Sequence, residues 1–342
     1  MRRILKIAGL LLLALIVLIA VALPFVVGIR PIIGPKARPL TDRTFERTPE
    51  RLARGDYLVN SVDGCLFCHS DREWDKPGLT LKADMLGAGH NFADEDIPFI
   101  SAPNITPDRE TGAGTWTDDM FARAIREGIG HDGRALFPVM PYESYRAMSD
   151  EDLASVIVYI RSLKPVRNTP TPSAIPFPVN RLIMSVPQPI TAPVSAPDRA
   201  NPVAYGEYLT HIGVCHDCHD TMDAQGQRVA GMTFAGGTVL PNPRGVVSSQ
   251  NITPAPSGIP YYTEDLFLEL MHTGMVKARK VSDMMPWVMY GHQTDEDLKA
   301  IFAYLKTVTP VNHRVDNSLP PTDCPVCGLK HGGGDTNKPT GS

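Results

Sequence analysis

The sequence predicts a mainly α-helical protein, with an N-terminal transmembrane helix followed by two tandem copies of one domain. Three observations support this prediction: a long uncharged segment near the N-terminus, an internal repeat, and helix signals that recur in both copies. The chain has 342 residues, of which 43% are hydrophobic and 20% charged, and this is a globular composition. A net charge of −4 gives no support to nucleic-acid binding, for which a basic surface is typical.

Residues 1–28 are predicted to form a single-pass membrane anchor. From Ile7 to Gly28 the chain has 22 residues without a charge, enough for a helix that crosses a bilayer. Positive charge before such a helix stays in the cytoplasm, and the basic residues here are Arg2, Arg3 and Lys6. A cleaved signal peptide is the alternative, although no small-x-small cleavage site follows the apolar run. Both alternatives export the rest, so we expect periplasm-facing domains at a bacterial cytoplasmic membrane.

The remainder of the chain repeats itself with a period of about 147 residues, which indicates a duplicated domain. The recurring blocks are C-x-x-C-H at 65–69 and 215–219, Asn-Ile-Thr-Pro at 104–107 and 251–254, Met-Pro at 140–141 and 285–286, and Asp-Glu-Asp-Leu at 150–153 and 295–298. The predicted segments are the anchor (1–28), a juxtamembrane linker (29–48), a first domain (49–168), a Pro-rich connector (169–202), a second domain (203–313) and a flexible tail (314–342).

Three helices are predicted in each copy, because a capping residue precedes each of three helical segments. The N-caps are Thr48, Thr117 and Ser149 in the first copy, and Asn201, Thr263 and Thr294 in the second. Gly128 and Gly274 are expected to end the middle helices in the left-handed conformation. Pro165 and Pro310 are expected to stop the last helices.

The first helix of each copy is expected to pack closely against the last. Gly55 and Gly206 would allow the close approach of the two backbones. Tyr57 and Tyr208 are expected to pack in the same helix–helix interface.

Each copy carries the attachment signature of a c-type haem, formed by Cys65, Cys68 and His69 in the first and by Cys215, Cys218 and His219 in the second. Two cysteines three residues apart on a starting helix can form thioethers with both vinyl groups of one porphyrin, and the next imidazole can bind the iron. A thioredoxin-like dithiol would need a βαβ context, and a zinc site would need further ligands at short spacing. We therefore predict two covalently bound haem c groups.

A methionine thioether is expected on the opposite face of each iron. Met140 and Met285 occupy matching positions, each before a proline and each ahead of the last helix. Core packing is the alternative role for a methionine. The other methionines that could compete are Met85, Met120 and Met148 in the first copy, and Met232, Met271, Met275, Met284 and Met289 in the second.

A third cysteine pair lacks the histidine that a c-type haem needs. Cys324 and Cys327 are followed by Gly328, with His331 further on. A local disulfide is the interpretation that an oxidising compartment favours, while metal binding with His331, free thiols or an intermolecular link remain open. His216, between the two cysteines of its motif, is expected to be a spacer. The remaining histidines are expected to be surface or packing residues; they are His90, His131, His211, His272, His292, His313 and His331.

These blocks resemble a duplicated class I cytochrome c. More narrowly, residues 49–313 resemble the membrane-associated multi-haem cytochrome c subunits of alcohol and aldehyde dehydrogenase complexes. Many such subunits have three haem motifs, whereas this chain has two. The resemblance implies a dihaem electron carrier in a respiratory chain, which passes electrons from a membrane or periplasmic dehydrogenase to an oxidase or a soluble cytochrome.

No constellation of catalytic acid, base or nucleophile stands out in the sequence, so the chain is expected to be an electron-transfer protein rather than an enzyme. A dihaem peroxidase or a sulfur-compound oxidase is the enzymatic alternative, and it would need an open sixth position at one iron. The matching Met-Pro sites in both copies argue against that asymmetry. A structural or assembly subunit is a third possibility.

Overall fold

The computed structural model describes residues 2–73, 76, 80–92, 97, 99–242 and 245–338, and most of its regular structure is helical. The helices of the N-terminal part and first half are α1 (Arg2–Val27), α2 (Arg30–Ile33), α3 (Pro49–Tyr57), the π-helical η1 (Leu58–Val62), α4 (Cys65–His69), α5 (Asp118–Glu127), α6 (Tyr142–Tyr145) and α7 (Asp150–Ile160). The connector contributes α8 (Val179–Leu182) and the 3-10 turn η4 (Ile183–Ser185). The later helices are α9 (Pro202–Ile212), α10 (Cys215–His219), α11 (Glu264–Thr273), α12 (Trp287–Tyr290), α13 (Asp295–Leu305) and the 3-10 turn η5 (Gly334–Thr336).

Strands are short and form antiparallel two-stranded ribbons. The pairs among the described residues are β1 (His90–Asn91) with β2 (Ser101–Ala102), β3 (Val239–Asn242) with β4 (Gly245–Ser248), β5 (Met275–Val276) with β6 (Arg279–Lys280), and β7 (Pro321–Asp323) with β8 (Lys330–Gly332). None of these ribbons is large enough to form a layer of its own, so the helices supply the core.

All six expected N-caps are confirmed. Each capping side chain accepts a hydrogen bond from the backbone N–H three residues later, at the starts of α3, α5, α7, α9, α11 and α13. Gly128 and Gly274 end α5 and α11 with φ of 74° and 69°, as expected. Helices α7 and α13 end at Ile160 and Leu305, a turn before the prolines expected to stop them.

In each half the first long helix packs against the last, α3 on α7 and α9 on α13. Glycines make this approach possible, because a Cβ on Gly55 would collide with the carbonyl oxygen of Ser155. A Cβ on Gly206 would collide in the same way with the carbonyl oxygen of Ala300. The role expected for these two glycines is confirmed.

The two tyrosines of these helices bind the opposite half of the molecule. Tyr57 donates to Asp297 at 2.7 Å, at the start of α13, and accepts from the backbone of Thr294. Tyr208 donates to Asp152 at 2.6 Å, at the start of α7, and accepts from the backbone of Ser149. The expectation that each tyrosine packs against the last helix of its own copy is therefore wrong. The two exchanged bonds relate the halves by an approximate twofold arrangement.

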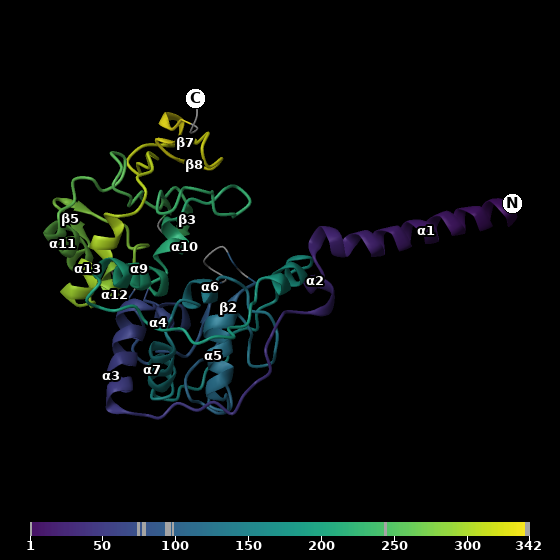
Figure 1. Ribbon diagram of the computed structural model, residues 1–342, viewed down its shortest axis with the longest axis horizontal. Coiled ribbons are helices and arrows are strands. Elements are labelled where there is room, and N and C mark those ends of the chain that lie inside the picture. Colours follow the sequence, from purple (N-terminus) through teal and green to yellow (C-terminus); the bar gives the residue numbers. More distant parts are fainter. Residues whose placement is uncertain are drawn as a thin grey trace.

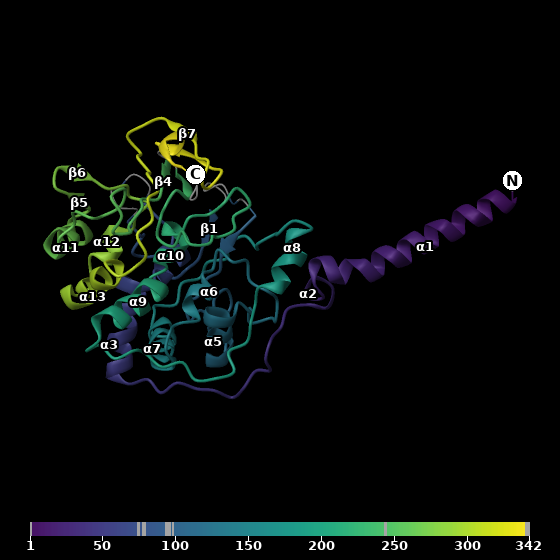
Figure 2. The same cartoon turned by 45° about the horizontal axis from the view of Figure 1, so that its top comes forward.

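Most buried apolar side chains of both halves belong to one continuous cluster, in which α3, η1 and α7 of the first half meet α9 and α13 of the second. A smaller cluster of Phe92, Ile100 and Ala102 lies in the first half alone. A further bond crosses the same boundary, from the side-chain amide of Gln293 to the backbone oxygen of Ser61 at 3.1 Å. Figures 1 and 2 show the two halves side by side, with α3 next to α9 and α13 in both views.

Helix α1 projects away from the rest of the molecule (Figure 1). It is the one helix among the described residues that is long and apolar enough to cross a membrane, over Arg3–Val27. Its described apolar side chains are almost all exposed, so they pack against no other part of the chain that the structure describes. The composition, the length and the lack of protein partners are those of a membrane anchor.

The segment after 313 was expected to be a flexible tail, but its described part is a small folded unit. It contains β7, β8 and η5, which lie together at one end of the second half (Figure 1). Asn317 ties it to β4, because its side chain exchanges two hydrogen bonds with the backbone of Ser248, at 2.9 and 2.8 Å. The segment therefore extends the second half instead of trailing from it.

Candidate cofactor-binding sites

Two short helices with the same internal spacing carry the predicted attachment cysteines. Helix α4 begins after Gly64, at φ 65°, and α10 begins after Val214, at φ 59°. A positive φ is costly for a β-branched valine, so the second site keeps a strained turn that the first builds with glycine. Within each helix the cysteines stand three residues apart, which places both sulfurs on one face.

The rings of both predicted proximal histidines are oriented by a hydrogen bond to a backbone carbonyl. The Nδ1 atom of His69 lies 2.8 Å from the carbonyl oxygen of Pro103, and that of His219 lies 2.8 Å from the carbonyl oxygen of Gln250. A carbonyl can only accept, so Nδ1 carries the proton and Nε2 keeps a free lone pair. Burial lowers the pKa of both imidazoles and keeps them neutral. A neutral imidazole oriented in this way is a preformed metal ligand.

The Asn-Ile-Thr-Pro blocks fix the position of those carbonyl groups, since each block directly follows the accepting residue. Asn104 donates to the backbone oxygens of Val166 and Asn168, at 2.8 and 3.1 Å. Asn251 donates likewise to Val311 and His313, at 2.8 and 3.0 Å. The repeated motif thus joins the chain beyond the last helix to the loop that orients the histidine.

Two tyrosines that we did not predict hold the turns before the attachment helices. The hydroxyl of Tyr145 donates to the backbone oxygen of Asp63, and that of Tyr290 donates to the backbone oxygen of Gly213 at 2.6 Å. Both acceptors stand two residues before the first cysteine of their site, and both tyrosine side chains are buried. The signal was present in the sequence, because Met-Pro is followed four residues later by tyrosine in both copies.

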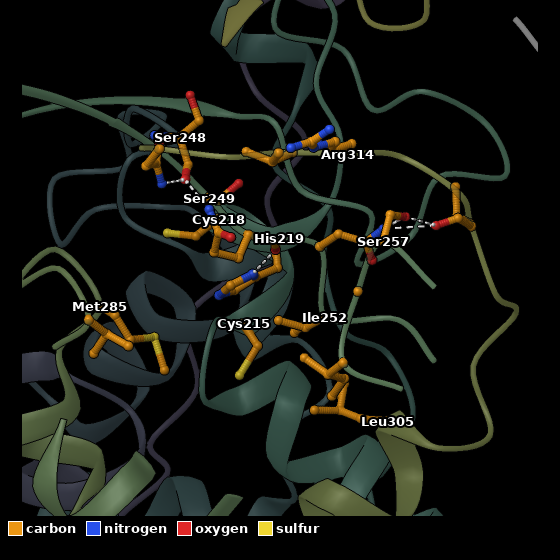
Figure 3. A pocket seen from close by; sticks show the side chains of 18 of the residues that line it. Cys215, Cys218, His219, Ser248, Ser249, Ile252, Ser257, Met285, Leu305 and Arg314 are labelled. Atoms are coloured by element: carbon orange, nitrogen blue, oxygen red, sulfur yellow. Dashed lines mark hydrogen bonds between the residues drawn. The ribbon is translucent and has the colours of Figure 1, made fainter. Parts of the chain in front are cut away.

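The second half encloses a cavity with a volume of about 1780 Å³, well above the roughly 300–1,000 Å³ of most small-molecule sites. Its walls bring together four predicted residues, Cys215, Cys218, His219 and Met285. Figure 3 shows the His219 ring with its Nδ1 side bonded to the backbone, and Met285 across the cavity from it. The size and this donor set fit a covalently attached porphyrin with an imidazole on one face and a thioether on the other.

The two predicted distal methionines occupy the same kind of loop. Met140 and Met285 are half-buried and pack against the common core. In both loops the carbonyl of the methionine accepts from the residue after the proline, Tyr142 at 2.8 Å and Trp287 at 2.7 Å. Met148 is fully buried in the core, whereas Met284, Met271 and Met232 line the cavity of the second half.

Both attachment helices lie close to the boundary between the halves. The Met289 sulfur lies 3.4 Å from the point where a Cβ would stand on Gly64, next to Cys65. Ser144 donates to Asp217, inside α10, at 3.1 Å. Burial, followed by the charges of Asp217 and of Cys68 from the other half, raises the pKa of the Cys218 thiol to about 11. No signal in the sequence predicted this adjacency.

Two expectations about cysteine and histidine residues are corrected. Cys324 and Cys327 are both buried thiols and are not joined by a disulfide. His216 is a buried structural residue instead of a spacer, because its ring lies 3.1 Å from the carboxylate of Asp220 and stacks on His211.

No family model matches the chain. It is 30% identical over 294 residues to the fructose dehydrogenase cytochrome subunit of Gluconobacter japonicus, covering 80% of this chain and 56% of the relative. It is 30% identical over 274 residues to the gluconate 2-dehydrogenase cytochrome c subunit of Pantoea cypripedii, covering 75% and 59%. The diheme cytochrome c-type protein of Cereibacter sphaeroides is 29% identical over 260 residues, with 72% of this chain and 83% of the relative covered.

The chain is a homologue of cytochrome c subunits. This bears out the resemblance inferred from the repeated blocks: two of these relatives are named as cytochrome subunits of dehydrogenases, and the third is named as a diheme cytochrome. The chain spans little more than half the length of the two dehydrogenase subunits, and it spans most of the diheme protein.

Proposed function

We propose that the chain is a dihaem c-type cytochrome that transfers electrons from a membrane or periplasmic dehydrogenase to an oxidase or a soluble cytochrome. The observation that carries the proposal is the pair of matched sites, each with two cysteines on one helix face and a neutral histidine whose Nε2 is left free. In this proposal residues 49–168 and 203–313 are tandem cytochrome c domains.

Each site would hold its group with residues that the repeat supplies twice. Cys65 and Cys68 would form thioethers in the first half, and Cys215 and Cys218 in the second, so that each half carries one haem c. The iron would be held by His69 and Met140 in the first half, and by His219 and Met285 in the second. A bound haem of this kind supplies a one-electron iron couple.

The surrounding residues keep these ligands in place. The carbonyls of Pro103 and Gln250 fix the two imidazole planes and strengthen them as donors. Tyr145 and Tyr290 hold the turns from which the attachment helices start. With a histidine and a methionine as ligands, each iron would have no position open to a substrate, as a carrier requires.

The boundary between the halves supports a two-centre carrier. Tyr57 and Tyr208 each bond to the opposite half, and the main apolar cluster is shared by both halves. These contacts hold α4 and α10 at a fixed separation, with Cys68 close enough to influence the Cys218 thiol. A fixed separation between two centres is what an intramolecular electron relay needs.

We place the carrier at the outer face of a bacterial cytoplasmic membrane, anchored by α1. The helix α8 packs on α2, directly after the anchor. Apolar side chains are exposed around this junction, where a bilayer surface would cover them; they are Ile29, Ile32, Ile33, Phe177 and Leu182. The basic residues at the start of α1, Arg2, Arg3 and Lys6, support a periplasmic location for both domains.

The proposal is tested by electron transfer with the full chain in proteoliposomes. A membrane dehydrogenase with its substrate serves as the electron donor, and a soluble cytochrome c serves as the electron acceptor. We expect the haem absorbance of the chain to be reduced by the dehydrogenase and reoxidised by the acceptor. Peroxide turnover by the chain alone, or binding of carbon monoxide to the unmodified reduced protein, would instead indicate an open iron and an enzyme.

A further inference from the structure

We propose that His313, Cys324, Cys327 and His331 form a structural zinc site that fastens the C-terminal segment to the second half. One ligand atom from each side chain lies within 4.8 Å of all the others, and the four residues are buried. Their exposed fractions run from 0 to 3%. A compact group of two thiols and two imidazoles, closed to solvent, has the donor set of a Cys₂His₂ site.

The turn between the cysteines has the geometry of a metal-binding knuckle. Gly328 follows Cys327 with φ at 72°, a conformation that glycine adopts without strain. Its N–H donates to the backbone oxygen of Cys324 at 2.9 Å, and the N–H of Cys324 donates to Leu329 at 2.9 Å. These bonds curl the chain around one point and turn both sulfurs toward it.

Each histidine presents its Nε2 atom to that point. The Nδ1 atom of His313 lies 2.9 Å from the backbone oxygen of Ala235, while its Nε2 lies 3.4 Å from the Cys324 sulfur. The Nδ1 atom of His331 lies 3.3 Å from the oxygen of Gly332, and its buried Nε2 has no hydrogen-bond partner among the described residues. Carbonyl groups on Nδ1 and free Nε2 atoms are the usual arrangement of zinc-bound histidines.

Residues outside the group support the same assignment. The side-chain amide of Asn337 lies 3.6 Å from the Cys324 sulfur, where it can donate to a thiolate. Gly237, at φ 91°, leaves the space for the rings, because a Cβ there would stand 2.6 Å from the His313 ring. Residues around the four ligands thus support the sulfur of Cys324 and leave room for the ring of His313.

The four donor atoms indicate which metal or cofactor the site would bind. A c-type haem would need a histidine directly after Cys327, and Gly328 stands there. Magnesium and calcium prefer oxygen atoms, whereas two thiolates and two imidazoles in a closed group suit zinc. Four protein ligands leave no open coordination position, so the role is structural and not catalytic.

The site would also stiffen one wall of the cavity in the second half. His313 follows α13, and the other three ligands belong to the C-terminal segment, so one ion would join two parts of the chain. Pro325, Val326 and Asn337 from this segment line the same cavity as His219. This added role rests on the proposed function, whereas the zinc site itself does not.

The test uses the full chain, purified in detergent from cells supplied with zinc. Elemental analysis is expected to give about one zinc per chain, separate from the iron. X-ray absorption at the zinc edge, which does not detect haem iron, is expected to show two sulfurs at about 2.3 Å and two nitrogens at about 2.0–2.1 Å. Chains that carry no zinc even after reduction and zinc addition, or that contain a Cys324–Cys327 disulfide or a third haem, would overturn the proposal.

Variants assign the ligands. Cys327→Ser and His331→Ala are expected to lower the zinc content at least about tenfold, and Asn337→Ala to weaken zinc affinity roughly 10–100-fold. His331→Cys keeps four ligands and should retain zinc, with three sulfurs in the absorption spectrum. His292→Ala, at an exposed histidine, is the matched control and should retain zinc fully. Retention of zinc with unchanged sulfur and nitrogen counts in Cys327→Ser would contradict the assignment.

Zinc and haem are counted separately in the same samples, so the two proposals can fail independently. Zinc without haem would contradict the proposed function and support the metal site. Two haems without zinc would support the proposed function and contradict the metal site.

Discussion

At the scale of single residues, each half repeats one arrangement around its histidine. His69 and His219 bind a carbonyl with Nδ1, and an asparagine directly after that carbonyl holds the loop. Met140 and Met285 are proposed as ligands because they occupy matching positions in the two copies. This role can be tested separately.

Replacing Met285 with alanine should open the sixth position of the second haem, because the thioether would be lost. The variant is then expected to bind carbon monoxide or azide and to have a lower reduction potential, measured by absorbance and by redox titration. Met140→Ala should do the same in the first half. Met284→Ala is the matched control, since this neighbour lines the same cavity. Ligand binding in Met284→Ala but not in Met285→Ala would reverse the assignment.

Replacing Asn251 with alanine should destabilise the second half. The amide donates to two backbone oxygens and accepts from Thr253, and the alanine variant would leave these buried groups without partners. We expect the free energy of unfolding to fall by about 1–3 kcal/mol, measured by urea denaturation. Asn104→Ala should behave alike, since its contacts are equivalent. No change in either variant would mean that the repeated motif does not hold the loop.

At the scale of elements, the close contact of α9 with α13 depends on a glycine. Gly206→Ala would force a Cβ against the carbonyl oxygen of Ala300 and should reduce the free energy of unfolding by about 1–3 kcal/mol. Thermal denaturation followed by circular dichroism measures the effect. Glu207→Ala, at the exposed neighbouring position, is the control and should change stability little. Equal stability of Gly206→Ala and the control would show that the helices can separate without cost.

The start of α7 makes the stability of the halves depend on pH. Burial alone would raise the pKa of Asp152, but hydrogen bonds and charge from Arg54, with a bond from Tyr208, outweigh it and lower the pKa. A lowered pKa contributes stability that is present above the unfolded value of about 3.9 and is lost as the pH falls below it. We therefore expect the free energy of unfolding to drop below about pH 4.

Urea denaturation at several pH values measures this dependence, with Asp152→Asn as the test variant. The variant should be less stable at pH 7 and should lose less stability on acidification. A wild-type chain and a variant with identical pH profiles would contradict a role for Asp152 in acid sensitivity.

Local signals explain why the helices could be predicted. An N-cap and a left-handed glycine act on backbone groups within a few residues, so Thr117 and Gly128 identify their helix without knowledge of the fold. The partner of Tyr57 could not be predicted in this way. Its acceptor Asp297 is 240 residues away, and the two copies offer the same aspartate at equivalent positions.

At the scale of the whole molecule, the duplication could be read from the sequence, but its spatial result could not. The repeat predicted two equal sites, and the structure places both attachment helices at one boundary. The C-terminal segment was expected to be flexible because it is polar and rich in glycine. It is held by residues outside it, through the contacts of Asn317 with Ser248 and of Cys324 with His313, so composition alone gave the wrong expectation.

The most direct test of the central claim is the intact mass of the mature full chain, purified after periplasmic maturation and denatured in acid. We predict the polypeptide plus two haem groups, with one haem lost in Cys65→Ala/Cys68→Ala, one lost in Cys215→Ala/Cys218→Ala, and both kept in Cys324→Ser/Cys327→Ser. A mature chain with fewer than two haems, or a haem count that the first two variants leave unchanged, would contradict it.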